Sequence, residues 1–266
     1  MADRNIFLGN TSDKAIEPSK IYIGDANDKA QLVSKIYVGN ESNKAVQVWP
    51  KMKWSDIYQK CEYLYNPNGT EWIRLDKKPD NNTRFILTFQ YTSDNTQGRN
   101  RYLIGANESY RHWGLSSFRN DNNGSKYFTI EYYWYVPAPH NPGGPSIQKN
   151  FSSLSDLYGK HTLDFNRSGG YFYLDDVLLG QSQITFSDLK YTIALFGSGG
   201  SRDSYYGETG TGYIYSFKAY QGNELIYDLV PCYRKNDLKP GMYDFANDYF
   251  YTNAGSGEFY KGPDIN

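Results

Sequence analysis

The chain has 266 residues, which is enough for one large β domain or for a small module followed by a domain of ordinary size. Its 28 basic and 29 acidic residues give a net charge of -1, so the composition provides no overall attraction for nucleic acid or for an anionic membrane. No stretch approaches the roughly 20 apolar residues of a membrane span, and the first residues lack the apolar core of a signal peptide, so we expect no secretion through a leader of its own. The 27 tyrosines, spread among many Gly, Asn, Ser and Asp residues, favour strands and turns over helices.

Residues 5–49 contain an internal repeat with a period of fifteen residues. Three units align without gaps, and the aligned positions include Gly9, Gly24 and Gly39 and, later in each unit, Ala15, Ala30 and Ala45. Each unit has a short apolar strand, a glycine, a polar turn and a second short strand, which together predict a minimal β-hairpin.

A single two-stranded hairpin is only marginally stable in water. We therefore expect the three hairpins to pack on one another, on the following domain, or on other copies of the chain. Because fibrous trimers use repeats of about this size, residues 1–50 are predicted to be an anchoring or oligomerisation module, with a trimer favoured. The apolar strand residues predicted to make these contacts are Ile6, Phe7, Ile21, Tyr22, Ile36 and Tyr37. A repeat that packs within a monomer is the alternative.

Trp49-Pro50 breaks the repeat, and residues 51–266 are predicted to form one domain. Cys61–Tyr65 and Trp72–Leu75 are expected to be its first strand pair, joined by turn-forming residues at 66–69. In the segment 84–91, Phe85, Leu87, Phe89 and Tyr91 share one face of a predicted strand. Further strands are predicted at 102–105, 113–118 and 128–136.

The proline-rich segment 137–145 predicts an irregular surface loop, and 153–158 is the one predicted helical turn. Residues 162–179 are expected to form a meander, and 191–196 a strand that leads into a long loop at 197–207.

The most regular pattern lies near the C-terminus. In the segment 213–220, Tyr213, Tyr215, Phe217 and Ala219 alternate with Ile214, Ser216, Lys218 and Tyr220, which predicts a strand. The turn residues 221–223 lead back into a second strand, 225–230, which is expected to end at Pro231 because proline cannot donate to a sheet ladder.

About a dozen short strands with turn signals between them predict an all-β fold, in which two sheets face each other in a jelly-roll sandwich. Cys61 and Cys232 lie near the two ends of this domain. A disulfide between them is conceivable, but two buried reduced thiols are favoured for a chain made in the cytoplasm.

The segment 212–259, "GYIYSFKAYQGNELIYDLVPCYRK…GMYDFANDYFYTNAGSGEF", resembles the C-terminal signature of concanavalin-like (laminin-G-like) jelly-roll domains in structural proteins of tailed bacteriophages. The "KIYVG…KA" units resemble repeats near the N-termini of phage tail and fibre proteins. This resemblance implies a virion surface protein that is made in the host cytoplasm and assembles with other virion proteins, as a head fibre, a decoration protein or a tail fibre.

Chemical motifs are scarce. His112, His140 and His161 lack metal-ligand spacing, and neither a nucleotide-binding motif nor a nucleophile elbow occurs. The candidate calcium loops near Gly98 and Gly124 fail the EF-hand pattern, although a rim calcium site built from separate loops stays open. A non-enzymatic protein without cofactors or metals is therefore expected.

A glycoside hydrolase on the same fold is an alternative, but it needs paired carboxylates, and Glu131 stands alone on its predicted strand. A purely architectural virion subunit without a ligand is a second alternative.

Binding to a glycan or to the host surface is the favoured function, because aromatic rings stack on sugars while Asn, Asp and Arg bond their hydroxyls. Two predicted loops mix these residue types, and the candidate contacts are Tyr110, Arg111, His112 and Trp113 in one loop and Arg202, Asp203, Tyr205 and Tyr206 in the other. Trp113 could equally be a core residue, and the two tyrosines could fix their loop or contact a neighbouring subunit.

Overall fold

The computed structural model describes residues 54–80, 82–92, 101–108, 111–120, 125–133, 146–167, 170–181, 192–197 and 210–265, together with four short strands between residues 22 and 49. For those four strands and for most of 101–133, it describes the backbone alone. The chain divides into two compact units, residues 1–56 and residues 57–266. Among the described residues, no helix is long and apolar enough to cross a membrane.

In the first unit, two of the three repeats form β-hairpins. Strand β1 (Tyr22–Gly24) pairs with β2 (Ala30–Leu32), and β3 (Ile36–Gly39) pairs with β4 (Ala45–Trp49), in both cases antiparallel. Gly24 lies opposite Ala30 and Gly39 lies opposite Ala45, so equivalent repeat positions occupy equivalent places in the ladders. The first repeat, with Ile6 and Phe7, lies outside the described residues, as does Ile21.

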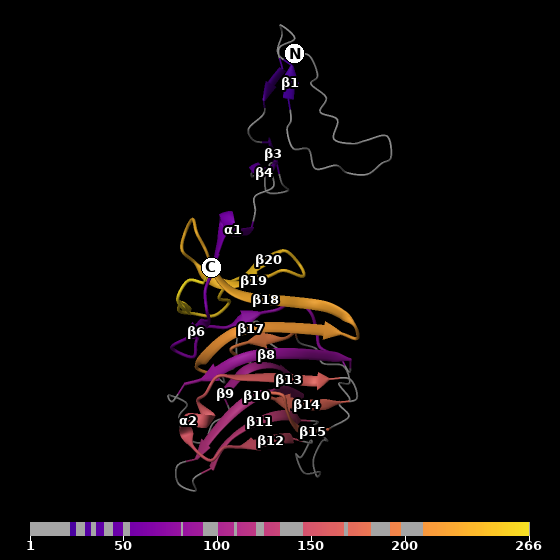
Figure 1. The fold of residues 1–266 in the computed structure, drawn as a ribbon, viewed down its shortest axis with the longest axis vertical. Coiled ribbons are helices and arrows are strands. Elements are labelled where there is room, and N and C mark those ends of the chain that lie inside the picture. Colours follow the sequence, from indigo (N-terminus) through magenta and orange to yellow (C-terminus); the bar gives the residue numbers. More distant parts are fainter. Residues whose placement is uncertain are drawn as a thin grey trace. The chain divides into compact units, whose positions relative to one another are not determined.

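The second unit is an all-β antiparallel sandwich of the jelly-roll type, as predicted, and Figure 1 shows its strands stacked side by side. The six-stranded sheet has the order β12 (Ser146–Asn150), β11 (Ser125–Tyr133), β10 (Arg111–Asn120), β9 (Arg101–Glu108), β16 (Ala194–Leu195) and β7 (Ile73–Arg74). The main path of the eleven-stranded sheet is β15 (Val177–Gln181), β14 (Tyr171–Leu174), β13 (His161–Arg167), β8 (Thr83–Tyr91), β17 (Gly212–Gln221), β18 (Glu224–Arg234), β19 (Pro240–Asp244) and β20 (Tyr249–Tyr251). Strands β6 (Leu64–Asn66), β21 (Tyr260–Lys261) and β5 (Tyr58–Lys60) join this sheet at its side. The described residues also form two short helices, α1 (Trp54–Ile57), which crosses the boundary between the units, and α2 (Leu154–Leu157).

Strand β8 is the centre of the core. Its residues alternate between buried and half-buried, and the predicted inner face of Phe85, Leu87, Phe89 and Tyr91 is confirmed. The Tyr91 hydroxyl donates a 2.9 Å hydrogen bond to the backbone carbonyl of Leu115 in β10, so one side chain ties the two sheets together. The core is therefore apolar, and one buried hydrogen bond across it holds the two sheets together.

The C-terminal hairpin is present, but the predicted faces of its first strand are wrong in part. A β-bulge between Ile214 and Ser216 shifts the register of β17 against β8. As a result Ile214 is buried before the bulge, whereas Phe217 and Ala219 are buried after it. A bulge adds one residue to one strand, so it reverses the inward positions beyond it.

The expected strand end at Pro231 is also wrong, since β18 continues to Arg234. The Pro231 carbonyl accepts a 3.1 Å hydrogen bond from the Cys61 N–H, so the proline nitrogen lies on that same edge of β18. At this point the neighbour of β18 changes from β17 to β5, and the proline accepts a bond from the new neighbour without being able to donate one in return. Cys61 and Cys232 are buried free thiols, as favoured from the sequence.

The predicted first strand pair is wrong as well. Strand β6 pairs with β17 and β21 in the large sheet, whereas β7 pairs with β16 in the small sheet. The turn between them exists, and the Asn66 side chain accepts a 2.7 Å bond from the Gly69 N–H. This turn carries the chain from one sheet to the other.

The predicted meander is confirmed as β13, β14 and β15, and the predicted helical turn as α2. Strands β9 and β10 are longer than predicted, and β16 is shorter.

Candidate functional site

The sequence-predicted glycan contacts fall mostly outside the described residues. Tyr110, Arg202, Asp203, Tyr205 and Tyr206 all lie there, and of Arg111, His112 and Trp113 only the backbone is described. That backbone belongs to β10, where Arg111 lies opposite Glu108 of β9. The expected loop from 107 to 113 is therefore mostly strand, because residues 107–108 belong to β9 and residues 111–113 belong to β10.

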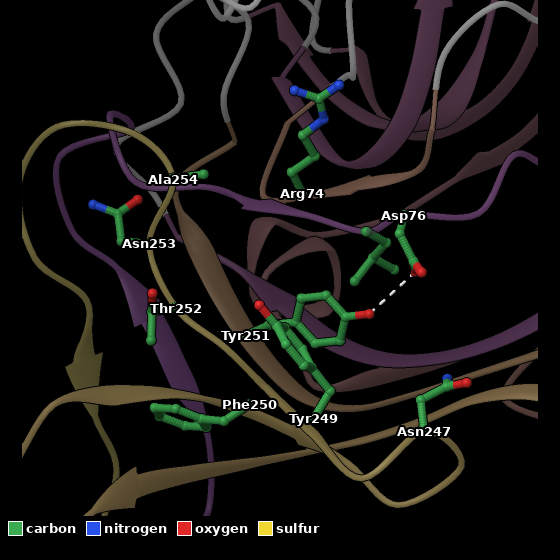
Figure 2. Close-up of a pocket in the computed structure, with 10 residues that line it drawn as sticks. Arg74, Asp76, Asn247, Tyr249, Phe250, Tyr251, Thr252, Asn253 and Ala254 are labelled. Atoms are coloured by element: carbon green, nitrogen blue, oxygen red, sulfur yellow. Dashed lines mark hydrogen bonds between the residues drawn. The ribbon is translucent and has the colours of Figure 1, made fainter. Parts of the chain in front are cut away.

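A pocket of about 610 Å³ lies elsewhere on the second unit, between β7 and the segment that follows β19. Figure 2 shows its side chains. The residues that line it are Arg74, Leu75, Asp76, Asn247, Tyr249, Phe250, Tyr251, Thr252, Asn253 and Ala254. Its volume falls in the range of small-molecule sites, and its lining combines aromatic rings with a few polar groups.

Asp76 is the charged centre of one side of this pocket. The hydroxyl groups of Tyr227 and Tyr251 both donate to its Oδ1 atom, the second at 3.2 Å (Figure 2), and the Tyr227 oxygen accepts a 2.7 Å bond from the Lys77 N–H. Burial acts to raise the pKa of the Asp76 carboxyl, but the two phenol hydrogen bonds and the Lys77 charge outweigh it, so this pKa lies below its ordinary value. The carboxylate is therefore ionised at neutral pH and held in one orientation.

The same contacts keep the two phenols protonated. Burial raises the pKa of the Tyr227 hydroxyl, and the hydrogen bond to Asp76 adds to this effect. Burial also raises the pKa of Tyr251, followed by the negative charge of Asp76. Both tyrosines therefore act as permanent donors to the carboxylate.

Tyr249 supplies the exposed aromatic surface of the pocket. The residue is 56% exposed, whereas Tyr251 is 9% exposed. The two rings pack edge to face with centroids 4.7 Å apart, which limits the movement of Tyr249. A held but exposed ring is suited to stacking on a flat apolar ligand surface.

The turn between β19 and β20 fixes another part of the lining. Asp244 is fully buried, and its Oδ1 atom accepts hydrogen bonds from the N–H groups of Asp228 at 2.9 Å and Ala246 at 3.0 Å. Its Oδ2 atom accepts a 2.6 Å bond from the Asn247 side chain, which also donates to the Ile226 carbonyl. Asn247 is thereby held at the edge of the pocket.

The third wall is formed by the loop after β20, which wraps around Trp72. The Asn253 side-chain oxygen accepts bonds from the N–H groups of Trp72 and Gly255, and its amide donates to the Gly257 carbonyl. A β-carbon on Gly255 would lie 2.5 Å from the Trp72 ring, so only glycine allows this close approach. The "NAGSG" part of the C-terminal signature is thus explained by packing.

Asp76 is the only acidic residue among those that line this pocket. A glycoside hydrolase needs two carboxylates flanking the scissile bond, and this pocket does not supply the pair. Among the residues with described side chains, no group of three His, Cys, Asp or Glu residues could hold a metal ion. His161 is buried, and its ring nitrogens lie 2.7 Å from the Asp175 carboxylate and 2.7 Å from the Asp156 carbonyl, which gives it a structural role.

Sequence reasoning missed this pocket because Asp76 and Tyr251 lie 175 residues apart, and because Tyr249–Tyr251 was interpreted only as part of a fold signature. A scan against protein-family models finds no match, and a search of curated proteins also finds none.

Proposed function

We propose that the chain is a non-enzymatic structural protein of a bacteriophage particle, a head fibre, decoration protein or tail fibre, whose second unit binds a glycan of the host surface. The single observation that carries the binding role is the joint presence of the exposed Tyr249 ring and the ionised Asp76 carboxylate in the lining of one pocket of ligand size. Such a ring can stack on the apolar face of a sugar while the carboxylate accepts its hydroxyl groups. Many copies on one particle would multiply a weak single-site affinity.

Replacing the exposed ring tests the binding role. Tyr249→Ala is expected to weaken glycan binding at least about tenfold, because a stacked aromatic ring at the centre of a site often contributes more than 1 kcal/mol. The measurement is binding of the full chain to an array of bacterial surface oligosaccharides, followed by titration of the best ligand.

Tyr260→Ala provides the matched control. Tyr260 is 60% exposed, lies on β21 and does not line the pocket, so this variant should bind within about twofold of the natural protein. Equal binding by Tyr249→Ala and the natural protein would exclude this pocket as the site. If the natural protein binds no glycan at all, the architectural alternative becomes the better one.

For the first unit, we propose that residues 1–50 anchor the protein to other virion proteins and join the chains, with a trimer favoured. The support is the tandem repeat and the equivalent pairing of glycine with alanine in its two described hairpins, which gives the repeats similar backbone edges that could pair with copies of themselves.

Removing the repeat tests this assembly role. The second unit has a buried hydrophobic core of its own between Cys61 and Phe259, so a chain of residues 51–266 keeps this core. It is expected to sediment as a monomer while the full chain sediments as a trimer. A truncated chain that is still trimeric would place the assembly surface on the second unit instead.

A further inference from the structure

The side of the pocket that contains Asp76 and Tyr249 offers mainly hydrogen-bond acceptors. The hydroxyl groups of Tyr227 and Tyr251 both donate their hydrogen bonds to the Oδ1 atom of Asp76, so Oδ2 is the oxygen without a phenol partner. A carboxylate oxygen in this setting accepts a hydrogen bond and repels a second anion.

Asn247 adds a second acceptor. Its side-chain nitrogen donates to the Ile226 carbonyl at 2.8 Å and to the buried Asp244 carboxylate at 2.6 Å, which uses both of its N–H groups. Because both partners can only accept, the orientation of this amide is fixed. Asn247 can therefore offer a ligand only its Oδ1 atom.

The other polar side chains of the lining bring no positive charge towards Asp76, and the hydroxyl groups of Tyr249 and Thr252 can donate as well as accept. Asn253 uses both ends of its amide within its own loop. The guanidinium group of Arg74 points away from Asp76 and from the tyrosine rings in Figure 2. Lys77, whose charge helps to lower the pKa of Asp76, is not among the residues that line the pocket.

The geometry points to a neutral, hydroxyl-rich sugar as the ligand of this pocket, with anionic glycans excluded. A sugar hydroxyl is a donor that suits Asp76 Oδ2 and Asn247 Oδ1, and an uncharged sugar ring presents C–H groups to Tyr249. Sialic acid, uronic acids and phosphorylated sugars instead bring a negative charge towards Asp76. This inference rests on the proposed glycan-binding function and names the class of glycan.

The experiment compares the full-length natural protein with the variant Asp76→Asn. Both are titrated with neutral oligosaccharides of glucose, galactose, mannose and N-acetylglucosamine, and with uronic acid and glucosamine oligomers of the same length. The natural protein should bind at least one neutral oligomer about tenfold or more tightly than its uronic acid counterpart, because a like charge at the site opposes binding. Asp76→Asn, which keeps an oxygen to accept from the two tyrosines, should lose about tenfold in affinity for the neutral ligand and bring the neutral and anionic affinities within about threefold of each other.

The outcomes separate the two proposals. If the natural protein binds no oligosaccharide, the glycan-binding function fails and this inference fails with it. If it prefers uronic acid or positively charged glucosamine oligomers, or if Asp76→Asn keeps the natural ratio of affinities, the inference about ligand class is overturned while glycan binding stands. A thermal unfolding curve for Asp76→Asn close to that of the natural protein shows that any loss of affinity arises at the site.

Discussion

Replacing Asp244 by alanine is expected to lower the free energy of unfolding of the second unit by about 3–5 kcal/mol. The carboxylate is fully buried and accepts hydrogen bonds from two backbone N–H groups and from Asn247. Alanine would remove the shared acceptor of these partly buried donors, and each donor left unsatisfied away from water is costly. Urea denaturation followed by near-ultraviolet circular dichroism, which reports on the packed aromatic residues, measures the change.

Asp228→Ala is the control for this prediction. Asp228 lies on β18 and pairs with Lys218 at 3.3 Å, but both side chains are partly exposed, so its loss should cost no more than about 1 kcal/mol. The stability of Asp244→Asn should lie between those of the two alanine variants, since asparagine keeps an acceptor oxygen but places an amide donor among other donors. Equal stabilities for Asp244→Ala and Asp228→Ala would mean that the buried carboxylate does not hold the turn.

The same substitution also connects stability to the proposed site. Asn247 is held by Asp244 and by the Ile226 carbonyl, so removal of the carboxylate frees one of its two anchors. We therefore expect Asp244→Ala to bind the glycan more weakly as a secondary effect. The affinity is measured without urea, at a temperature where the variant is still folded.

The fold could be predicted from the sequence where local pattern and burial agree. Strand β8 alternates without interruption, and its inner residues are those that the period of two assigns. In β17 the same argument failed, because the bulge near Ser216 arises in the pairing with β8 and has no local sequence signal. Pro231 misled for a related reason, since its cost depends on which neighbour its nitrogen faces.

The candidate site was harder to predict than the fold. Asp76 follows a strand of two residues, and nothing in its neighbourhood marks it as different from other surface aspartates. It gains its role from Tyr227 and Tyr251, which the fold brings from the C-terminal hairpin region. The ligand contacts were instead predicted in loops rich in Asn, Arg and Tyr. Composition indicates where a ligand could be bound, but not which residues the fold brings together.

Replacing Gly255 by alanine should be the most damaging single-methyl change in the C-terminal loop, with an expected cost of about 2–4 kcal/mol. The added β-carbon would overlap the Thr70 carbonyl and lie 2.5 Å from the Trp72 ring, and neither a backbone oxygen nor a buried indole can easily move aside. Gly180→Ala is the matched control, since its β-carbon would meet only Ile147 at an ordinary 3.6 Å, and it should change stability by no more than about 0.5 kcal/mol.

Because Gly255 follows directly after the pocket residues Asn253 and Ala254, a displaced loop would also move one wall of the site. Gly255→Ala should therefore lose glycan affinity as well as stability, whereas Gly180→Ala should lose neither. If Gly255→Ala proves as stable as Gly180→Ala in thermal and urea denaturation, the close packing of this loop on Trp72 is wrong. The proposal that this loop forms one wall of the pocket would then also fail, because the position of the loop depends on the same contact.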